Sequence, residues 1–217
     1  MRKLVAEFLG SMILLLAAVS PVILFDNVLG SPIYITILAN AIAVAFVICA
    51  LIEIFGPVSG AHFNPVVTMA LMFEKKVSAK EAAMYVVAQI AGGIAGIILT
   101  HLMFYDYIGG LLFVSDVARS GYTNFGEIIG TFVLIFAILM VVKLKSPKAP
   151  IIIGLLVGGQ VMATSSTMFA NPMVTIARMF TNSIAGISPL DGLIFIAMQV
   201  VGALLAYAVY RAVFRRE

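Results

Sequence analysis

The sequence predicts an all-α membrane protein with six transmembrane helices and two re-entrant half-helices, arranged as an inverted repeat. Three observations lead to this class: an apolar composition, two Asn-Pro segments that open short apolar runs, and a duplication of landmarks along the chain. Of the 217 residues, 63% are hydrophobic and 11% are charged, and the mean hydropathy is +1.16. Such a composition is typical of a chain that folds in a lipid bilayer.

The two Asn-Pro segments predict a pore. They are Ser59 to Thr68 and Thr167 to Thr175, and they share Asn-Pro-x-Val-Thr. In each, Asn can cap a helix and Pro can take its first position, where the missing N–H costs nothing. The runs that follow, Val66 to Phe73 and Met173 to Phe180, fall far short of the roughly 20 residues that cross a bilayer. Each therefore predicts a half-helix, which a membrane tolerates only where its approach is buried in protein or lines a watery cavity.

The duplication predicts one channel domain over residues 1–217, made of repeat 1 (about 1–110) and repeat 2 (about 120–217). Glu7-Phe-Leu-Gly10-Ser11 recurs as Glu127-Ile-Ile-Gly130-Thr131, and Ala88-Gln89 recurs as Met198-Gln199. Each half supplies three spans, so the second half should insert upside down relative to the first. The half-helices then enter from opposite faces and meet near the midplane, where the solute pathway of such repeats lies.

The six spans follow from the apolar runs. The first resembles a signal peptide after Arg2-Lys3, but Glu7 and Gly10 have counterparts in the second half, so we interpret it as a retained helix. The expected spans are about Leu4–Phe25, Ile33–Phe55, Ala79–Phe104, Phe125–Val142, Ile151–Ser165 and Leu190–Phe214. Small residues recur four apart within them, which lets helix backbones approach closely inside one subunit; the pairs are Ala6/Gly10, Gly92/Gly96, Gly126/Gly130, Gly154/Gly158 and Gly202/Ala206.

The basic residues predict orientation in the cell membrane, with both termini cytoplasmic. Eleven of the 13 fall on one side of the predicted spans, which the positive-inside bias makes the cytoplasmic side; they are Arg2, Lys3, Lys75, Lys76, Lys80, Lys143, Lys145, Lys148, Arg211, Arg215 and Arg216. Because this charge flanks apolar spans, we expect the lipid bilayer and no nucleic acid as the partner. The single Cys49 excludes a disulfide framework and a multi-cysteine metal site within the chain, and no cofactor or metal is expected.

The pore centre should attract solute oxygens and repel cations. Each half-helix N-terminus carries about +0.5 of a charge, and the two are expected to face each other. If the side-chain oxygens of Asn64 and Asn171 cap their own helices, each NH₂ group can donate into the lumen. Positive helix ends of this kind exclude protons and cations from a pore. We therefore assign the pore centre to Asn64, Pro65, Val66, Asn171, Pro172 and Met173.

Over its whole length the chain resembles the major intrinsic proteins, the family of aquaporins and glycerol facilitators. The resemblance rests on both Asn-Pro motifs, in which Val66 and Met173 stand where the family usually has Ala. It implies a six-helix bundle with two pore half-helices, assembled as a homotetramer with one pore per subunit. In the family, Glu residues matching Glu7 and Glu127 accept hydrogen bonds from the half-helix loops, and this structural buttress is favoured over a proton relay.

The resemblance also predicts an unusual outer filter. The family usually has Arg three residues after the second Asn, and Val174 stands there. Counting from the two Asn residues places Val44, Gly159 and Met168 at the other filter positions, and Gly159 resembles the small residue of glycerol-conducting members. Arg178 lies one turn beyond Val174 and either adds charge at the outer mouth or, as we favour, bonds loop carbonyls. His62 is interpreted as a pore-loop hydrogen-bonding residue in preference to a metal ligand.

These features predict a passive channel for water and small uncharged solutes such as glycerol, urea or undissociated metalloid acids. The alternative from another class is a structural or adhesion membrane protein of the same fold with a closed pore. The paired Asn donors favour conduction, because a dry, occluded pore would leave them without partners. An enzyme is disfavoured, since the sequence has no visible nucleophile–base pair, cofactor loop or metal cluster.

Overall fold

The computed structural model describes residues 1–119 and 121–215, and these form helices and connecting loops. The first half contains α1 (Arg2–Val22), which continues as the π-helical turn η1 (Ile23–Val28), then α2 (Ile33–Ser59), α3 (Pro65–Phe73) and α4 (Ala79–Met103). The short α5 (Tyr105–Ile108) follows. The second half contains α6 (Tyr122–Lys143), α7 (Ala149–Ala163), α8 (Pro172–Arg178) and α9 (Pro189–Val209), which continues as η2 (Tyr210–Phe214).

Local sequence explains where several of these helices begin and end. Pro occupies the first turn of α3, α7, α8 and α9, where its lack of an N–H is harmless. Ser78 and Ser188 cap α4 and α9, because their hydroxyl oxygens accept the N–H of Glu81 and Asp191 at 3.2 and 3.3 Å. Gly60 ends α2 with a φ of +91°, a conformation that costs glycine little.

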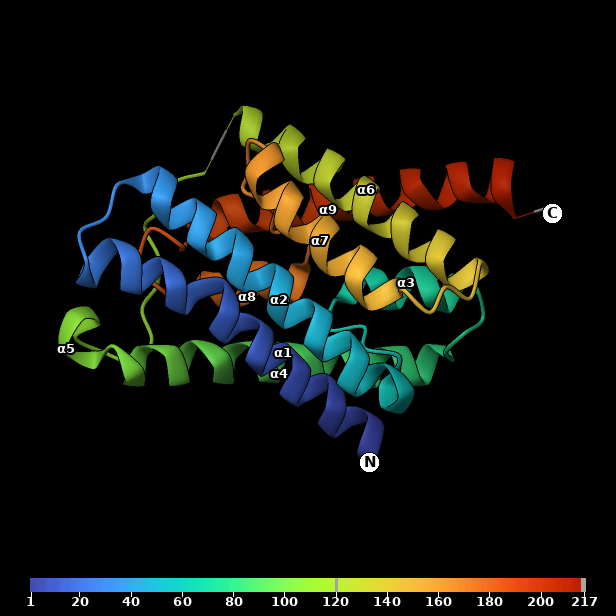
Figure 1. Ribbon diagram of the computed structural model, residues 1–217, viewed down its shortest axis with the longest axis horizontal. Helices are drawn as coiled ribbons and strands as arrows, with labels where there is room; N and C mark the ends of the chain where they lie inside the picture. Colours follow the sequence, from blue (N-terminus) through green and yellow to red (C-terminus); the bar gives the residue numbers. More distant parts are fainter. Residues whose placement is uncertain (120, 216–217) are drawn as a thin grey trace.

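The two halves repeat one packing plan. The α1 helix packs along α4 and α2 in the first half, and α6 packs along α9 in the second, while α2 and α7 join the halves. The short helices α3 and α8 lie end to end along the long axis near the middle of the molecule, with the longer helices around them (Figure 1). The elements of the second half thus follow the order of the first.

Glycines allow these helix pairs to touch backbone to backbone. A Cβ added at Gly92 of α4 would lie 2.2 Å from the carbonyl oxygen of Phe8 in α1, and one at Gly202 of α9 would lie 2.4 Å from that of Ile128 in α6. Gly158 of α7 approaches the carbonyl oxygen of Ala41 in α2 in the same way. Small residues four apart therefore serve packing within the chain, as the sequence predicted.

One of the six expected spans is short for a membrane crossing. Five of the described helical segments are long and apolar enough to cross a membrane, namely Arg2–Val28, Ile33–Ser59, Ala79–Met103, Tyr122–Lys143 and Pro189–Phe214. The sixth expected span corresponds to α7, which has 15 residues and therefore reaches only about 22 Å, less than the roughly 30 Å of a hydrocarbon core. It ends at Ala163 because the irregular approach to the second half-helix begins there.

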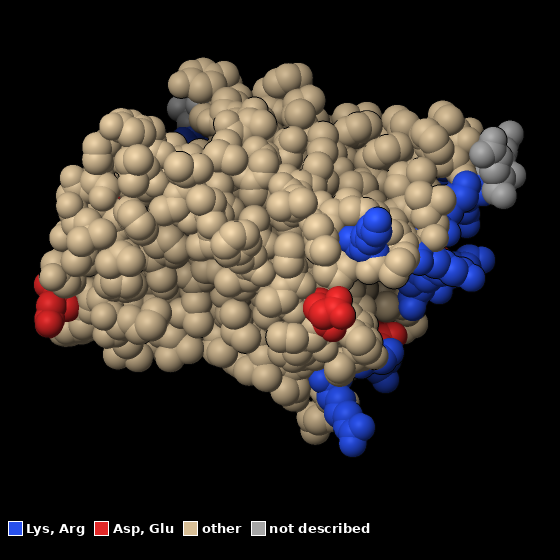
Figure 2. All heavy atoms as spheres, in the orientation of Figure 1, with Lys and Arg blue, Asp and Glu red and all other residues tan. Residues whose placement is uncertain are grey.

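Charge is distributed unevenly over the surface. Lys and Arg gather toward the end of the molecule near which the N- and C-termini lie, as Figure 2 shows in the orientation of Figure 1. Two ion pairs form among the described residues, Lys3 with Glu81 at 2.8 Å and Arg215 with Glu74 at 3.4 Å. Arg216, another of the basic residues predicted to be cytoplasmic, lies outside the described residues.

Candidate functional site

The two half-helices are capped by the asparagines of the repeated motif. The Oδ1 atom of Asn64 accepts the N–H of Val66 at 3.0 Å, and that of Asn171 accepts the N–H of Met173 at 3.0 Å. Pro65 and Pro172 follow as the first helical residues. Each cap satisfies backbone donors that the first turn of a helix leaves free.

Each asparagine also bonds to the opposite half of the protein. The Nδ2 atom of Asn64 donates to the carbonyl oxygen of Ala170 at 2.9 Å, and that of Asn171 donates to the carbonyl oxygen of Phe63 at 2.9 Å. Each amide thus has one N–H bonded to protein and a second N–H that can still donate into the lumen, as expected of these residues. The bonded N–H of each amide ties the two loops together.

A buried carboxylate supports each pore loop. Glu7 accepts the N–H groups of His62 and Phe63 at 3.0 and 2.8 Å. Glu127 accepts those of Phe169 and Ala170 at 2.9 and 2.8 Å. Both carboxylates are fully buried. Pairs of successive backbone N–H groups form a concave anion site, so each loop is shaped around a carboxylate.

Glutamine and threonine connect each carboxylate to its half-helix. Gln89 donates to Glu7 at 2.7 Å and to Thr68 at 3.0 Å, and the hydroxyl of Thr68 donates to the carbonyl oxygen of Asn64 at 3.0 Å. The second half repeats this chain of contacts through Gln199, Glu127, Thr175 and Asn171. The same four residue types thus make the same hydrogen bonds in each half, and these bonds hold the two pore loops in equivalent conformations.

The loops hold an unusual backbone. Ala61 and Phe63 in the first loop, and Thr167, Met168 and Ala170 in the second, have φ values between +46° and +58°. Residues with a Cβ adopt this left-handed region at a cost, and they stay there only where their surroundings impose it. The hydrogen bonds to Glu7 and Glu127 are the constraint that the structure provides at Phe63 and Ala170.

A cavity of about 190 Å³ passes between the halves and is lined mainly by aliphatic side chains. It follows stripes of residues four apart: Asn40, Val44, Ile48 and Ile52 on α2, and Ala149, Ile153, Val157 and Val161 on α7. Twelve helical residues span about 18 Å, so the cavity is elongated along these helices. Both Asn64 and Asn171 lie on its wall. Its volume corresponds to roughly a dozen waters if each needs about 15 Å³.

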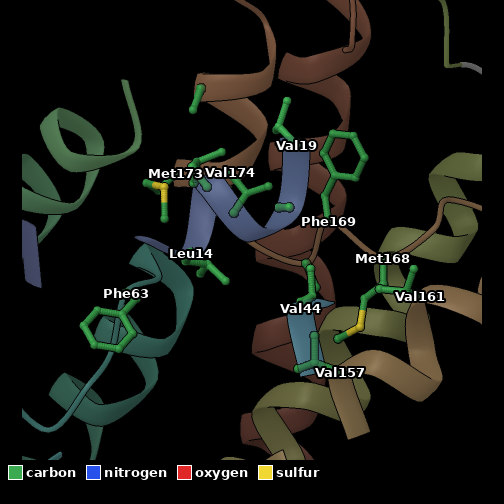
Figure 3. Close-up of a cluster of buried hydrophobic side chains, with 14 of the residues drawn as sticks. Leu14, Val19, Val44, Phe63, Val157, Val161, Met168, Phe169, Met173 and Val174 are labelled. Carbon is green, nitrogen blue, oxygen red and sulfur yellow. The ribbon is translucent and has the colours of Figure 1, made fainter. Parts of the chain in front are cut away.

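Three of the four residues assigned to the outer filter line this cavity. Val44, Met168 and Val174 all lie on its wall and are at most 6% exposed. Figure 3 shows Val44, Val157, Val161 and Met168 gathered in one part of the buried cluster, with the Met168 side chain directed toward the valines. This part of the cavity wall is apolar.

The assignment of Gly159 to the filter is wrong. Gly159 is exposed, and a Cβ added to it would meet nothing within 4 Å. Val157 and Val161 line the cavity instead. Successive helical residues turn by about 100°, so a residue two positions from Val157 or Val161 lies on the opposite face of α7.

Two residues assigned to the pore centre pack behind it. Met173 is fully buried, and its sulfur lies close to Gly93 of α4. Val66 belongs to a second apolar cluster, with Ile135 and Ala203 among its members. Neither is among the residues that line the cavity. The side chains of Met173 and Val66 therefore contribute to helix packing.

His62 and Arg178 both lie on the cavity wall and both bond to protein groups. Nδ1 of His62 lies 3.0 Å from the hydroxyl of Thr68, and its ring packs edge-on against Tyr85 at 5.1 Å. Nε of Arg178 donates to the carbonyl oxygen of Ala185. Within residues 1–119 and 121–215, no group of three or more His, Cys, Asp or Glu side chains could hold a metal ion.

The sequence analysis missed three residues near Arg178. Asn40 lines the cavity, and when its amide is oriented to satisfy both atoms, its nitrogen donates to the carbonyl oxygen of Ala18 at 3.1 Å. Asn40 is an amide within an apolar span, and a polar residue at such a place could have been predicted to be functional from the sequence. Phe169 lies under two guanidinium groups, Arg178 at 3.8 Å and Arg119 at 5.0 Å from the ring centroid. Nothing in the sequence links Arg119 to that ring, because 50 residues separate them.

The fold and the half-helix site define a class of membrane channel. The family model described as major intrinsic protein matches residues 1–170, and the chain belongs to this family. The family comprises channels for water or glycerol that catalyse no reaction, so this chain is a multi-pass membrane channel for small neutral solutes and is not an enzyme.

Relatives cover nearly the whole chain. It is 37% identical to the protein named aquaglyceroporin AqpS from Rhizobium meliloti (strain 1021), over 97% of this chain and 89% of that one. It is 31% identical to the probable aquaporin PIP2-7 from Oryza sativa subsp. japonica, over 100% of this chain and 80% of that one. The X-ray structure of the aquaglyceroporin from Plasmodium falciparum has the same fold, with a TM-score of 0.74, 19% identity and coverage of 99% and 97%.

Proposed function

We propose that the protein is a passive channel in the cell membrane whose wide, apolar outer filter admits neutral solutes larger than water. The observation that carries the proposal is the elongated aliphatic cavity, in which Val174 takes the place where a guanidinium would narrow the passage. Glycerol, urea and undissociated metalloid acids are the expected solutes beside water. The similarity to a protein named as an aquaglyceroporin supports the same class of solute.

In this proposal α1, α2, α4, α6, α7 and α9 are the six crossings, and α3 and α8 are the re-entrant half-helices of two inverted repeats. The gathering of basic residues at the end near both termini supports a cytoplasmic location for that end. We also infer a homotetramer with one pore per subunit, from membership of the family.

The polar groups of the pore divide into donors and supports. The free N–H of Asn64 and that of Asn171 donate to a passing oxygen, while the N-terminal ends of α3 and α8 make the same region positive and so unfavourable for cations. Glu7 and Glu127 hold the loops in place and take no part in proton transfer, because their oxygens are occupied by backbone and glutamine donors.

Swelling of liposomes that contain the purified protein tests the proposal. Light scattering follows the volume of vesicles exposed to water, glycerol, urea and arsenous acid gradients, with empty liposomes as the reference. We expect all four solutes to permeate faster than in empty liposomes. Water should not gain the high rate that its small size would allow, because an aliphatic constriction offers few hydrogen bonds. Conduction of water alone would refute the wide filter and point to Met168 or Arg178 as the obstruction. No conduction of any solute would favour the closed-pore structural protein.

A further inference from the structure

A second cavity, of about 180 Å³, adjoins the cavity that holds Asn64 and Asn171. It shares Asn40, Val161, Thr167 and Arg178 with the pore lining, and it adds Arg119 from the loop before α6. Two guanidinium groups therefore line one cavity, next to a cavity whose wall is mainly aliphatic.

The protein fixes the positions of both guanidinium groups. Arg119 donates from Nε to the carbonyl oxygen of Gly186 at 2.8 Å and from Nη2 to that of Ile184 at 2.7 Å. Arg178 donates from Nε to the carbonyl oxygen of Ala185, which lies between those two residues. Both stack on the ring of Phe169, so their central carbons are within about 9 Å of each other. Neither side chain needs to be ordered by a ligand.

These two charges have no carboxylate partner among the described residues. Both ion pairs in the described ranges involve other residues, Lys3 with Glu81 and Arg215 with Glu74. The carboxylate of Asp191 accepts the backbone N–H of Arg119 at 2.8 Å and the hydroxyl of Ser188 at 2.9 Å. Burial lowers the pKa of Arg119, and the negative charge of Glu127 opposes that shift only in part.

The remaining N–H groups are available to a ligand. Within residues 1–119 and 121–215, the Nη atoms of Arg178 and the Nη1 atom of Arg119 make no hydrogen bond to the protein. Guanidinium groups with free Nη hydrogens bind oxyanions through paired, charge-assisted hydrogen bonds. Partial burial strengthens such bonds, because water competes less for the donors.

We propose that Arg119 and Arg178 form a binding site for a small oxyanion from solution, such as phosphate, at the outer mouth of the channel. The anion is expected to stay at the mouth, because the aliphatic side chains of the pore wall, such as Val44, Met168 and Val174, cannot replace the water that an anion loses on entry. Bound there, it narrows the entrance, so an external oxyanion is expected to slow the entry of neutral solutes. The site would thus make permeation sensitive to the oxyanion concentration outside the cell.

Isothermal titration of the purified protein with inorganic phosphate, at an ionic strength held constant with chloride, tests the site. We expect saturable binding of one phosphate per chain, with sulfate as a competitor. Arg119→Gln and Arg178→Gln should each weaken binding about tenfold or more, the effect of losing one charge-assisted contact. Arg178→Lys should fall between the wild type and Arg178→Gln, because an ammonium keeps the charge but lacks the planar pair of donors.

Arg211→Gln is the matched control, because Arg211 is an exposed arginine near the C-terminal end and its loss should leave phosphate binding unchanged. Arg119 and Arg178 also bond loop carbonyls, so their replacement can disturb the loop as well as remove a phosphate contact. Phosphate binding by the wild type is therefore the decisive measurement. Absence of saturable binding there, or equal binding by the Arg119→Gln/Arg178→Gln double variant, would overturn the proposal. Weaker phosphate binding in nanodiscs of anionic lipid than in zwitterionic ones would assign the site to a lipid headgroup and also overturn it. The titration needs no solute flux, so its outcome is independent of the swelling assay.

Discussion

Glu127→Gln is the substitution that most directly tests how the second pore loop is held. The carboxylate of Glu127 accepts three hydrogen bonds, from the N–H groups of Phe169 and Ala170 and from Gln199, at 2.9, 2.8 and 2.6 Å. Glutamine has the same shape but one acceptor oxygen and one donor group. If its oxygen faces Ala170 and Gln199, its NH₂ must face the N–H of Phe169, and a buried donor is left without an acceptor.

The expected loss of stability follows from these contacts. An unsatisfied buried N–H costs about 1–3 kcal/mol. The two surviving bonds lose the assistance of a full charge, and bonds to charged groups contribute about 1.5–3 kcal/mol each against roughly 1 for neutral ones. We therefore expect the free energy of unfolding to fall by about 2–7 kcal/mol. For a chain of this size that corresponds to a fall in Tm of roughly 4–28 °C.

Thermal unfolding in detergent, followed by circular dichroism, measures this change, with Glu53→Gln as the matched control. Glu53 is an exposed carboxylate on α2, so its replacement should shift stability by no more than about 0.5 kcal/mol. Proton flux into liposomes should remain at the background level for the wild type and for Glu127→Gln. Equal stability of Glu127→Gln and Glu53→Gln, or a proton flux that the substitution abolishes, would refute the buttress role and favour a proton relay.

Three further predictions concern the pore wall. Val174→Arg should suppress glycerol flux more than water flux in liposome swelling, because it narrows the filter; an equal loss of both would contradict this. Val157→Phe should reduce solute flux, since Val157 lines the cavity, whereas Gly159→Phe should not; similar flux changes in the two variants would argue against the corrected orientation of α7. Asn64→Leu should lower stability by about 1 kcal/mol for the lost cap and reduce solute flux. Unchanged flux through a folded Asn64→Leu/Asn171→Leu channel would contradict the assignment of the central donor site to these two residues.

Much of the architecture could be predicted because it depends on local chemistry and on composition. The Asn-Pro pairs cap helices through contacts within three residues, so the starts of α3 and α8 were readable from the motif alone. Long apolar runs mark helices that lipid must surround, and five of them have the length and composition to cross. The matching positions of Glu7 with Glu127 and of Gln89 with Gln199 come from the duplication.

Only the tertiary structure decided which side chains face the pore and what joins the halves. Gly159 was assigned to the filter by its distance from Asn171. The residues between them include Thr167, Met168 and Ala170, which have positive φ values and are not helical. The regular turn of about 100° per residue is therefore lost there, and the distance along the chain does not tell which face of α7 a residue lies on. The bonds from Asn64 to Ala170 and from Asn171 to Phe63 join residues more than 100 positions apart. The arginines over Phe169 likewise come from separate segments. Local pattern fixes how a segment folds, but the direction of its side chains across an irregular loop depends on long-range contacts that no local pattern contains.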